Sequence, residues 1–269
     1  MQLRDTSFAA VAVALLCAAL SAASSCGAAP SAEDVMTQNF TISKVADSTQ
    51  DAAFRLINSQ GQERVRETTG QTKLLPGTTD NRRIVVFTAP ADIRGTKTLL
   101  IEHSGGDDDI WIYLPAMKKV RRLVANNKKD SFVGTDFSYG DVIGYRVEDW
   151  NQTLLREEPL NAVACWVIQS TPRSAEVADI SGYTKRISWI DKRSYIAVRT
   201  EIYDKEGAYV KRLTQEDIRE IDPQNHKWQA MRLTAENAQT GHRTIIELKN
   251  FKANIGVGDA EFTPSYLEH

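Results

Sequence analysis

The feature that most constrains the fold is a period of two in the apolar residues, which recurs from about residue 53 to residue 251. Charged Arg199 and Glu201, for example, alternate with apolar Val198 and Ile202. Successive strand residues point to opposite faces of a sheet, so this pattern predicts strands with one apolar and one solvated face. The candidate strands are 53–57, 63–67, 82–87, 97–102, 110–114, 119–123, 145–155, 163–171, 183–190, 195–203, 209–221, 227–234 and 244–251.

The connections between these strands are short and carry turn signals such as Gly105-Gly106-Asp107 and Asp204-Lys205-Glu206-Gly207. Such connections leave no room for crossover helices, so the strands are predicted to pair antiparallel in chain order. The residues on either side of Ser59-Gln60-Gly61-Gln62 predict the first hairpin. No repeat or linker divides the chain, which predicts a single large domain.

Sequence typical of helices is scarce. Ser31 can cap a short amphipathic helix over 31–45, a second helix is predicted over about 126–143, and a turn near Pro264. The predicted fold class is therefore mainly β (α+β): one large curved antiparallel sheet whose concave side is covered by a few helices. A long twisted sheet curls around what covers it, and here the hollow is expected to be larger than the helices fill.

The first 25 residues predict a signal peptide. Arg4 precedes an apolar run from Phe8 to Leu20, which is too short to span a bilayer and is followed by small residues. We therefore expect export to the periplasm and a mature domain over 26–269. Cys26 directly follows the small residues and is a candidate for a lipid anchor, although no large aliphatic residue precedes it at the position usual in bacterial lipoproteins.

Composition excludes several classes of function. The net charge of -2 gives no overall basic field for nucleic acid. Cys165 lies alone in an apolar run, which predicts a buried, inert thiol. The four histidines are far apart, and Asp107-Asp108-Asp109 is typical of a solvated turn, so neither a metal nor a cofactor is expected.

Catalysis has no support in the sequence motifs. No nucleophile elbow, phosphate-binding loop or dinucleotide fingerprint occurs, and Glu157-Glu158 before Pro159 is interpreted as part of a turn. We expect a protein that is not an enzyme. A hydrolase whose site is assembled from distant residues stays open as an alternative, because such sites are recognised by geometry and not by order.

The most distinctive stretch joins two motifs. The first reads Trp111-Ile112-Tyr113-Leu114-Pro115-Ala116-Met117-Lys118-Lys119-Val120-Arg121-Arg122, and the second reads Ser131-Phe132-Val133-Gly134-Thr135-Asp136-Phe137-Ser138-Tyr139-Gly140-Asp141. Together they resemble the outer-membrane lipoprotein-sorting family, the LolA/LolB-like periplasmic carriers. The likeness continues through Trp189-Ile190-Asp191-Lys192 to Phe262-Thr263-Pro264, so it covers nearly the whole mature chain. Met117 in place of leucine and Gly140 in place of glutamate are mild departures.

The resemblance implies a half-barrel of about eleven strands, with helices plugging its open side, that binds acyl chains without catalysis. The expected partners are a lipid or acylated lipoprotein cargo, together with an inner-membrane exporter or an outer-membrane acceptor. Members of this branch often look like accessory proteins of resistance-nodulation-division exporters, so a docking subunit of such an exporter is the alternative to a carrier. We expect a monomer that binds no nucleic acid.

Two groups of residues are candidates for the site. The first group is predicted to line the ligand cavity or to form its lid, against the alternative of ordinary core packing. The second is predicted to dock a partner or a lipid headgroup, against the alternative of a solvated strand face. The cavity or lid group is Trp111, Tyr113, Leu114, Met117, Phe132, Phe137 and Tyr139, and the docking group is Lys118, Lys119, Arg121 and Arg122.

Overall fold

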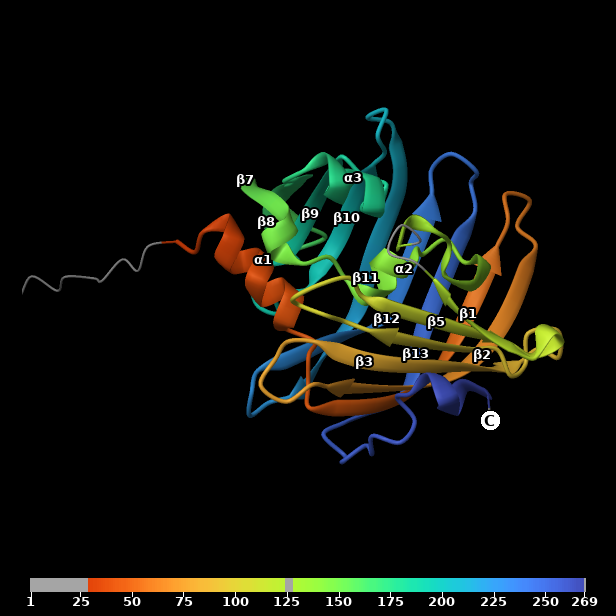
Figure 1. Ribbon diagram of the computed structural model, residues 1–269. Coiled ribbons are helices and arrows are strands. Elements are labelled where there is room, and N and C mark those ends of the chain that lie inside the picture. Colours follow the sequence, from red (N-terminus) through yellow and green to blue (C-terminus); the bar gives the residue numbers. More distant parts are fainter. Residues whose placement is uncertain (1–28, 124–127, 269) are drawn as a thin grey trace, which may run out of the picture.

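The computed structural model describes residues 29–123 and 128–268. The predicted signal peptide and Cys26 lie outside these residues. Figure 1 shows a single strongly curved sheet that bends around the short helix α2. The strands are β1 Asp47–Ile57, β2 Glu63–Leu74, β3 Asn81–Ala89, β4 Lys97–Ile101, β5 Asp109–Leu114, β6 Lys119–Leu123, β7 Trp150–Leu160, β8 Val163–Pro172, β9 Lys185–Asp191, β10 Ala197–Tyr203, β11 Tyr209–Asp222, β12 Lys227–Asn237 and β13 Arg243–Ala253.

The sheet is one open array of 13 strands in the order β6-β5-β4-β3-β2-β1-β13-β12-β11-β10-β9-β8-β7. Every neighbouring pair is antiparallel, as the short connections predicted. The predicted fold class is confirmed, with 13 strands in place of about eleven. Each candidate strand corresponds to a strand of the sheet, because the period of two survives wherever one face is buried.

The strand order places the connection between β6 and β7 across the concave side of the sheet. β1 pairs with β13 at the middle of the array, so the chain runs outward to β6 and then resumes at the opposite edge with β7. The connection between the two edges must therefore cross the sheet. Its described residues, 128–149, are called the plug segment here; they contain η3 Phe132–Gly134, α2 Tyr139–Ile143 and η4 Val147–Asp149.

The helices follow local signals. Ser31 caps α1, Ala32–Thr41: its hydroxyl accepts from the Asp34 amide at 3.1 Å, and the Asp34 carboxylate accepts from the Ser31 amide at 3.2 Å. The helix ends before the predicted residue 45, because the Ile42 carbonyl accepts a hydrogen bond from the Trp228 amide of β12. The other described helices are α3 Ala175–Ser181, η1 Pro115–Met117 and η5 Pro264–Glu268.

Three local predictions were wrong. The helix expected over about 126–143 is only α2 within the described residues, because Val133 and Gly134 have positive φ angles and Gly144 ends the helix. The strand expected over 145–155 begins at Trp150, and Tyr145 and Val147 instead pack inward from the plug segment.

The turn expected at Glu157-Glu158-Pro159 is part of β7. Proline is tolerated there because β7 is an edge strand and needs no second ladder partner. The turn follows at Asn161 and Ala162, whose φ angles are +48° and +67°. This pair of positive angles is the geometry of a tight hairpin.

Both faces of the amino-terminal half of the sheet are covered. On the concave face, Phe54, Val85 and Leu100 pack against Phe132 of the plug segment. On the convex face, Ile84 and Leu99 pack against the carboxyl-terminal segment through Phe262 and Leu267. The expectation of one solvated face is therefore wrong for β3 and β4.

Candidate functional site

A cavity of about 370 Å³ lies between the concave face of the sheet, the plug segment and α1. Small-molecule sites commonly have volumes of about 300–1,000 Å³, so the space suits a slender ligand. Most of its wall is apolar, which favours a hydrocarbon chain over a polar solute. The apolar lining includes Met36, Phe40, Val45, Ala52, Phe54, Val85, Phe132, Phe137, Val142, Ile143, Val147, Ile196, Ala197, Leu213, Leu233, Ile246, Leu248 and Phe251.

The plug segment is fixed to the sheet by polar contacts before α2 and within it. The Arg66 guanidinium donates to the Val133 carbonyl at 2.5 Å, and the Thr244 hydroxyl donates to the Asp136 carboxylate at 2.7 Å. Arg83 of β3 donates to the Val142 carbonyl of α2. These bonds come from β2, β13 and β3, which lie within four neighbouring strands of the array, so they fix the segment to the middle of the sheet.

An ion pair anchors α2 itself. The Asp141 carboxylate lies 2.7 Å from the Lys211 ammonium of β11 and accepts from the Ser138 amide at 2.9 Å. Its side chain has no exposed surface. Burial raises the pKa of Asp141, but the Lys211 charge and the hydrogen bonds from Lys211 and Ser138 outweigh it and hold the pKa below its usual range. The carboxylate is thus kept charged inside the protein.

Aromatic rings surround this anchor. Tyr145 lies with its ring edge-on to Trp150 at 5.7 Å and to Tyr183 at 6.0 Å, and the Lys211 ammonium contacts the Tyr183 hydroxyl at 3.0 Å. Burial raises the pKa of Tyr145 well above its ordinary value. A side chain at Gly140 would meet the Tyr145 hydroxyl at 2.5 Å, so the glycine lets α2 sit directly on this ring.

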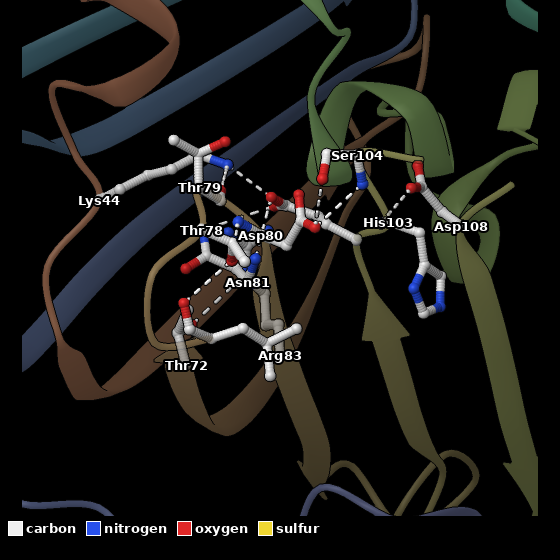
Figure 2. A network of polar contacts seen from close by, with 12 residues as sticks. Lys44, Thr72, Thr78, Thr79, Asp80, Asn81, Arg83, His103, Ser104 and Asp108 are labelled. Atoms are coloured by element: carbon white, nitrogen blue, oxygen red, sulfur yellow. Dashed lines mark hydrogen bonds and ion pairs between the residues drawn. The ribbon is translucent and has the colours of Figure 1, made fainter. Parts of the chain in front are cut away.

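A second polar network closes the end of the cavity near α1, and Figure 2 shows it around Lys44, Asn81 and Arg83. The Lys44 ammonium lies 2.5 Å from the Glu102 carboxylate, and both side chains are about 10% exposed. Glu102 also accepts from the Asn81 amide at 3.0 Å. Desolvation lowers the pKa of Lys44 against the opposing pull of Glu102.

The structure divides the predicted cavity or lid residues between two faces. Phe132 and Phe137 line the cavity. Tyr139 is buried beside them, with its ring edge-on to Phe132 at 5.4 Å. These three therefore lie together in the plug segment.

The remaining predicted lining residues lie elsewhere. Trp111 and Tyr113 pack on the convex face with Phe262 and Tyr266, Leu114 is half-buried at the end of β5, and Met117 is 43% exposed. None of them lines the described cavity. The motif residues Trp111 and Tyr113 share a face with each other but not with Ile110, the residue of β5 that faces the plug segment.

The predicted docking residues belong to β6, the edge strand of the sheet, and to the turn before it. Lys118, Lys119, Arg121 and Arg122 are exposed. Arg121 and Arg122 point to opposite faces, as successive strand residues must. Arg122 lies 2.8 Å from Asp109 through its Nε and rests over the Trp111 ring, whereas Lys118 has a left-handed conformation with φ +48°. The four cations are not gathered on one face.

Sequence reasoning missed two arginines of the cavity, Arg83 and Arg186. Their position in the alternation was the available signal. Arg83 lies two residues from Val85 in β3, and Arg186 lies four residues from Ile190 in β9. Residues an even number of positions apart share a face of the strand, so each arginine is on the inward face.

The next features concern a metal site, a reactive cysteine and a membrane span. In residues 29–123 and 128–268, no group of three or more His, Cys, Asp or Glu side chains is arranged to hold a metal ion. Cys165 is buried, and burial raises the pKa of its thiol. No helix in the described ranges has the length and apolar character that a membrane span requires.

An open antiparallel sheet that curves around an apolar hollow closed by a crossing segment defines a LolA-type fold. A family model described as "Uncharacterized protein" matches residues 79–269, well over half of the chain, and the chain belongs to this family. Solved structures described as outer-membrane lipoprotein-sorting and DUF1329 proteins are similar to it, and a LolA superfamily structure shares its fold, which agrees with the resemblance carried by the two sequence motifs. Among curated proteins, none matches the chain.

Two solved structures are similar in both sequence and shape. One is a domain from Vibrio parahaemolyticus described as an outer membrane lipoprotein-sorting protein, with 27% identity and a TM-score of 0.80 over 88% of this chain and 98% of that one. The other is a DUF1329 family protein from Desulfovibrio piger, with 27% identity and a TM-score of 0.81; the match covers 88% of this chain and 97% of that one. A LolA superfamily protein from Nitrosomonas europaea shares the fold, with 20% identity and a TM-score of 0.68 over 88% and 100%.

Proposed function

We propose that this protein is a periplasmic carrier that holds an acyl chain of a lipid or lipoprotein in the cavity beneath the plug segment, and that it does so without catalysis. The observation that carries the proposal is the cavity itself. It is lined by apolar residues from six or more strands and from the plug segment. The similarity to lipoprotein-sorting proteins supports the same function.

The energetics favour an acyl ligand. Burial of each methylene contributes roughly 0.8 kcal/mol, so a chain that enters the cavity is drawn out of water without any covalent step. The plug segment is suited to act as a movable cover, because it is not a strand of the sheet. It is held to the sheet by side-chain contacts such as Arg83 to Val142 and Lys211 to Asp141. A cover of this kind can move while the 13-stranded array stays intact.

Export by the signal peptide and a periplasmic location belong to this proposal. The docking alternative rests on Lys118, Lys119, Arg121 and Arg122, which are exposed at and beside the edge strand β6 but do not all share one face. Binding to an inner-membrane exporter or to an outer-membrane acceptor therefore stays a prediction of the family resemblance.

Two neighbouring alanines of β1 offer a matched test. Ala52 lines the cavity, whereas Ala53 points to the other face of the strand and does not. We expect delipidated wild-type protein to bind a fluorescent hexadecanoic-acid probe saturably. Ala52→Phe should weaken this binding at least about tenfold, which corresponds to about 1.4 kcal/mol, because the added ring occupies the space for the chain.

Ala53→Phe is the control, and it should bind the probe as the wild type does. Fluorescence titration of the three proteins, with circular dichroism to establish that each is folded, gives the answer. No saturable binding by the wild type, or equal binding by the Ala52→Phe variant, would contradict the proposed carrier function.

A further inference from the structure

Two guanidinium groups line the cavity without a carboxylate to neutralise them. Arg83 projects from β3 and Arg186 from β9. Neither has a carboxylate oxygen within 4.0 Å among residues 29–123 and 128–268. Both residues are half-buried, and a charge held largely out of water without a partner is costly, so this arrangement calls for an explanation.

Arg186 is held in place by aromatic rings. Its guanidinium carbon lies 4.6 Å from the centre of the Tyr145 ring and 5.7 Å from that of Trp150. Its Nε is buried and has no hydrogen-bond partner in the described part of the chain. The rings orient the planar group but accept no hydrogen bond in its plane. The guanidinium therefore keeps the donors that bind carboxylate and phosphate oxygens.

The carboxylates whose charges act on these arginines are already engaged. Asp141, whose charge acts on Arg186, is bonded to Lys211 and to the Ser138 amide. Glu102, whose charge acts on Arg83, is bonded to Lys44 and to the Asn81 amide. Asp80 also acts on Lys44, but it does not line the cavity and accepts from the Ser104 amide at 2.9 Å.

Arg83 is only partly used by the protein. It donates to the Val142 carbonyl and, at 3.4 Å, to the Thr72 hydroxyl. Desolvation lowers the pKa of its guanidinium. Its positive charge therefore lies in the cavity wall and not in solvent. An anion inside the cavity would be attracted to this charge strongly.

We propose that the cargo is an anionic amphiphile whose carboxylate or phosphate group enters the cavity with its acyl chain and binds Arg186, while Arg83 adds a second positive charge. The apolar wall takes the chain, and the oxyanion supplies the acceptors that Arg186 lacks. This inference rests on the proposed carrier function and names the ligand class for the same cavity. A neutral ester or alcohol of equal length would leave both cations unpaired.

The test compares ligands that differ only in their head. Isothermal titration of the full protein is made with dodecanoate, dodecyl phosphate and methyl dodecanoate at neutral pH. Hydrogen bonds to charged groups contribute about 1.5–3 kcal/mol, so at least one of the two anions should bind about 10- to 100-fold more tightly than the ester. An advantage confined to dodecyl phosphate assigns the site to phosphate headgroups, and one confined to dodecanoate assigns it to fatty acids.

Variants locate the effect. Arg186→Gln should remove most of the anion's advantage and leave the affinity for methyl dodecanoate within about threefold, while Arg186→Lys should keep part of it, because the charge remains but the planar donor group does not. Arg199→Gln is the matched control: Arg199 also lies over a ring, that of Trp189 at 4.9 Å, but it pairs with Glu201 and does not line the cavity.

The outcomes separate the two proposals. Equal affinity of the wild type for the anions and the ester would overturn the anionic cargo but leave the carrier function standing. An advantage that survives in Arg186→Gln, or that also disappears in Arg199→Gln, would overturn the assignment to Arg186. Failure of all three ligands to bind would instead contradict the carrier function.

Discussion

Replacing Asp141 with asparagine should lower the free energy of unfolding by about 3–5 kcal/mol, because it leaves the Lys211 ammonium buried without its counter-charge. The loss is large because the Asp141 side chain has no exposed surface and Lys211 is only 11% exposed. Urea unfolding followed by tryptophan fluorescence measures it. We expect the plug segment to be the first part released, since Asp141 anchors α2.

Two comparisons make this prediction specific. The double variant with Asp141→Asn and Lys211→Met should recover much of the lost stability, because an uncharged pair of similar size leaves no ammonium buried without its counter-charge. Asp179→Asn removes the carboxylate that pairs with Lys205 at an exposed site, and it should hardly change stability. Equal losses in the Asp141 and Asp179 variants would contradict the role of the buried pair.

The same carboxylate predicts a dependence on pH. The pKa of Asp141 in the folded protein lies below its ordinary value of 3.8, so its contribution to stability is fully present above that value and is lost as pH falls through the lower, folded pKa. Wild-type stability should therefore decline on acidification more steeply than that of Asp141→Asn. Unfolding curves between about pH 5 and pH 2 test this, and parallel declines would contradict it.

Phe132→Ala is expected to lower the free energy of unfolding of the ligand-free protein by about 3–5 kcal/mol, the usual cost of removing a buried phenyl ring. Phe132 is 1% exposed and packs on Tyr139 and Phe54 while it lines the cavity. The vacated space is continuous with the cavity. A bound acyl chain should therefore fill part of it and restore more stability to this variant than to the wild type.

Phe262→Ala is the matched control for this ligand effect. Phe262 is 3% exposed, but it packs on the convex face and does not line the cavity. Its loss should destabilise the protein to a similar degree without any added rescue by ligand. Thermal unfolding with and without dodecanoate shows the difference, and equal rescue of both variants would speak against a ligand beside Phe132.

The fold was largely predictable because apolar residues at every second position are what a sheet with one buried face requires. Every candidate strand was found, and strands that follow each other in the chain pair as the short connections predicted, except β6 and β7, which form the two edges of the sheet. The alternation of apolar and polar residues does not indicate which strands form the two open edges of the sheet. The pairing of β1 with β13, which sends residues 128–149 across the hollow, depends on contacts between the two ends of the chain.

The site was less predictable than the fold, for physical reasons. Phe132 and Phe137 lie where their loop was expected to cover the cavity. Trp111 and Tyr113 were grouped with them as aromatic residues of the same motif, yet they pack under the carboxyl-terminal segment, because that segment provides apolar cover for the convex face. Arg83 and Arg186 were overlooked because inward charges are rare in a core and read as solvated residues.

The central claim is that the hydrocarbon chain lies between the plug segment and the concave face. Photo-crosslinking with a fatty acid that carries a diazirine at its methyl end, followed by peptide mass spectrometry, tests it most directly. We expect adducts on cavity residues such as Phe54, Val85, Phe132 and Ile246, and their loss when unlabelled fatty acid competes. Adducts on the convex face around Trp111 and Tyr266, or labelling that competitor does not reduce, would contradict it.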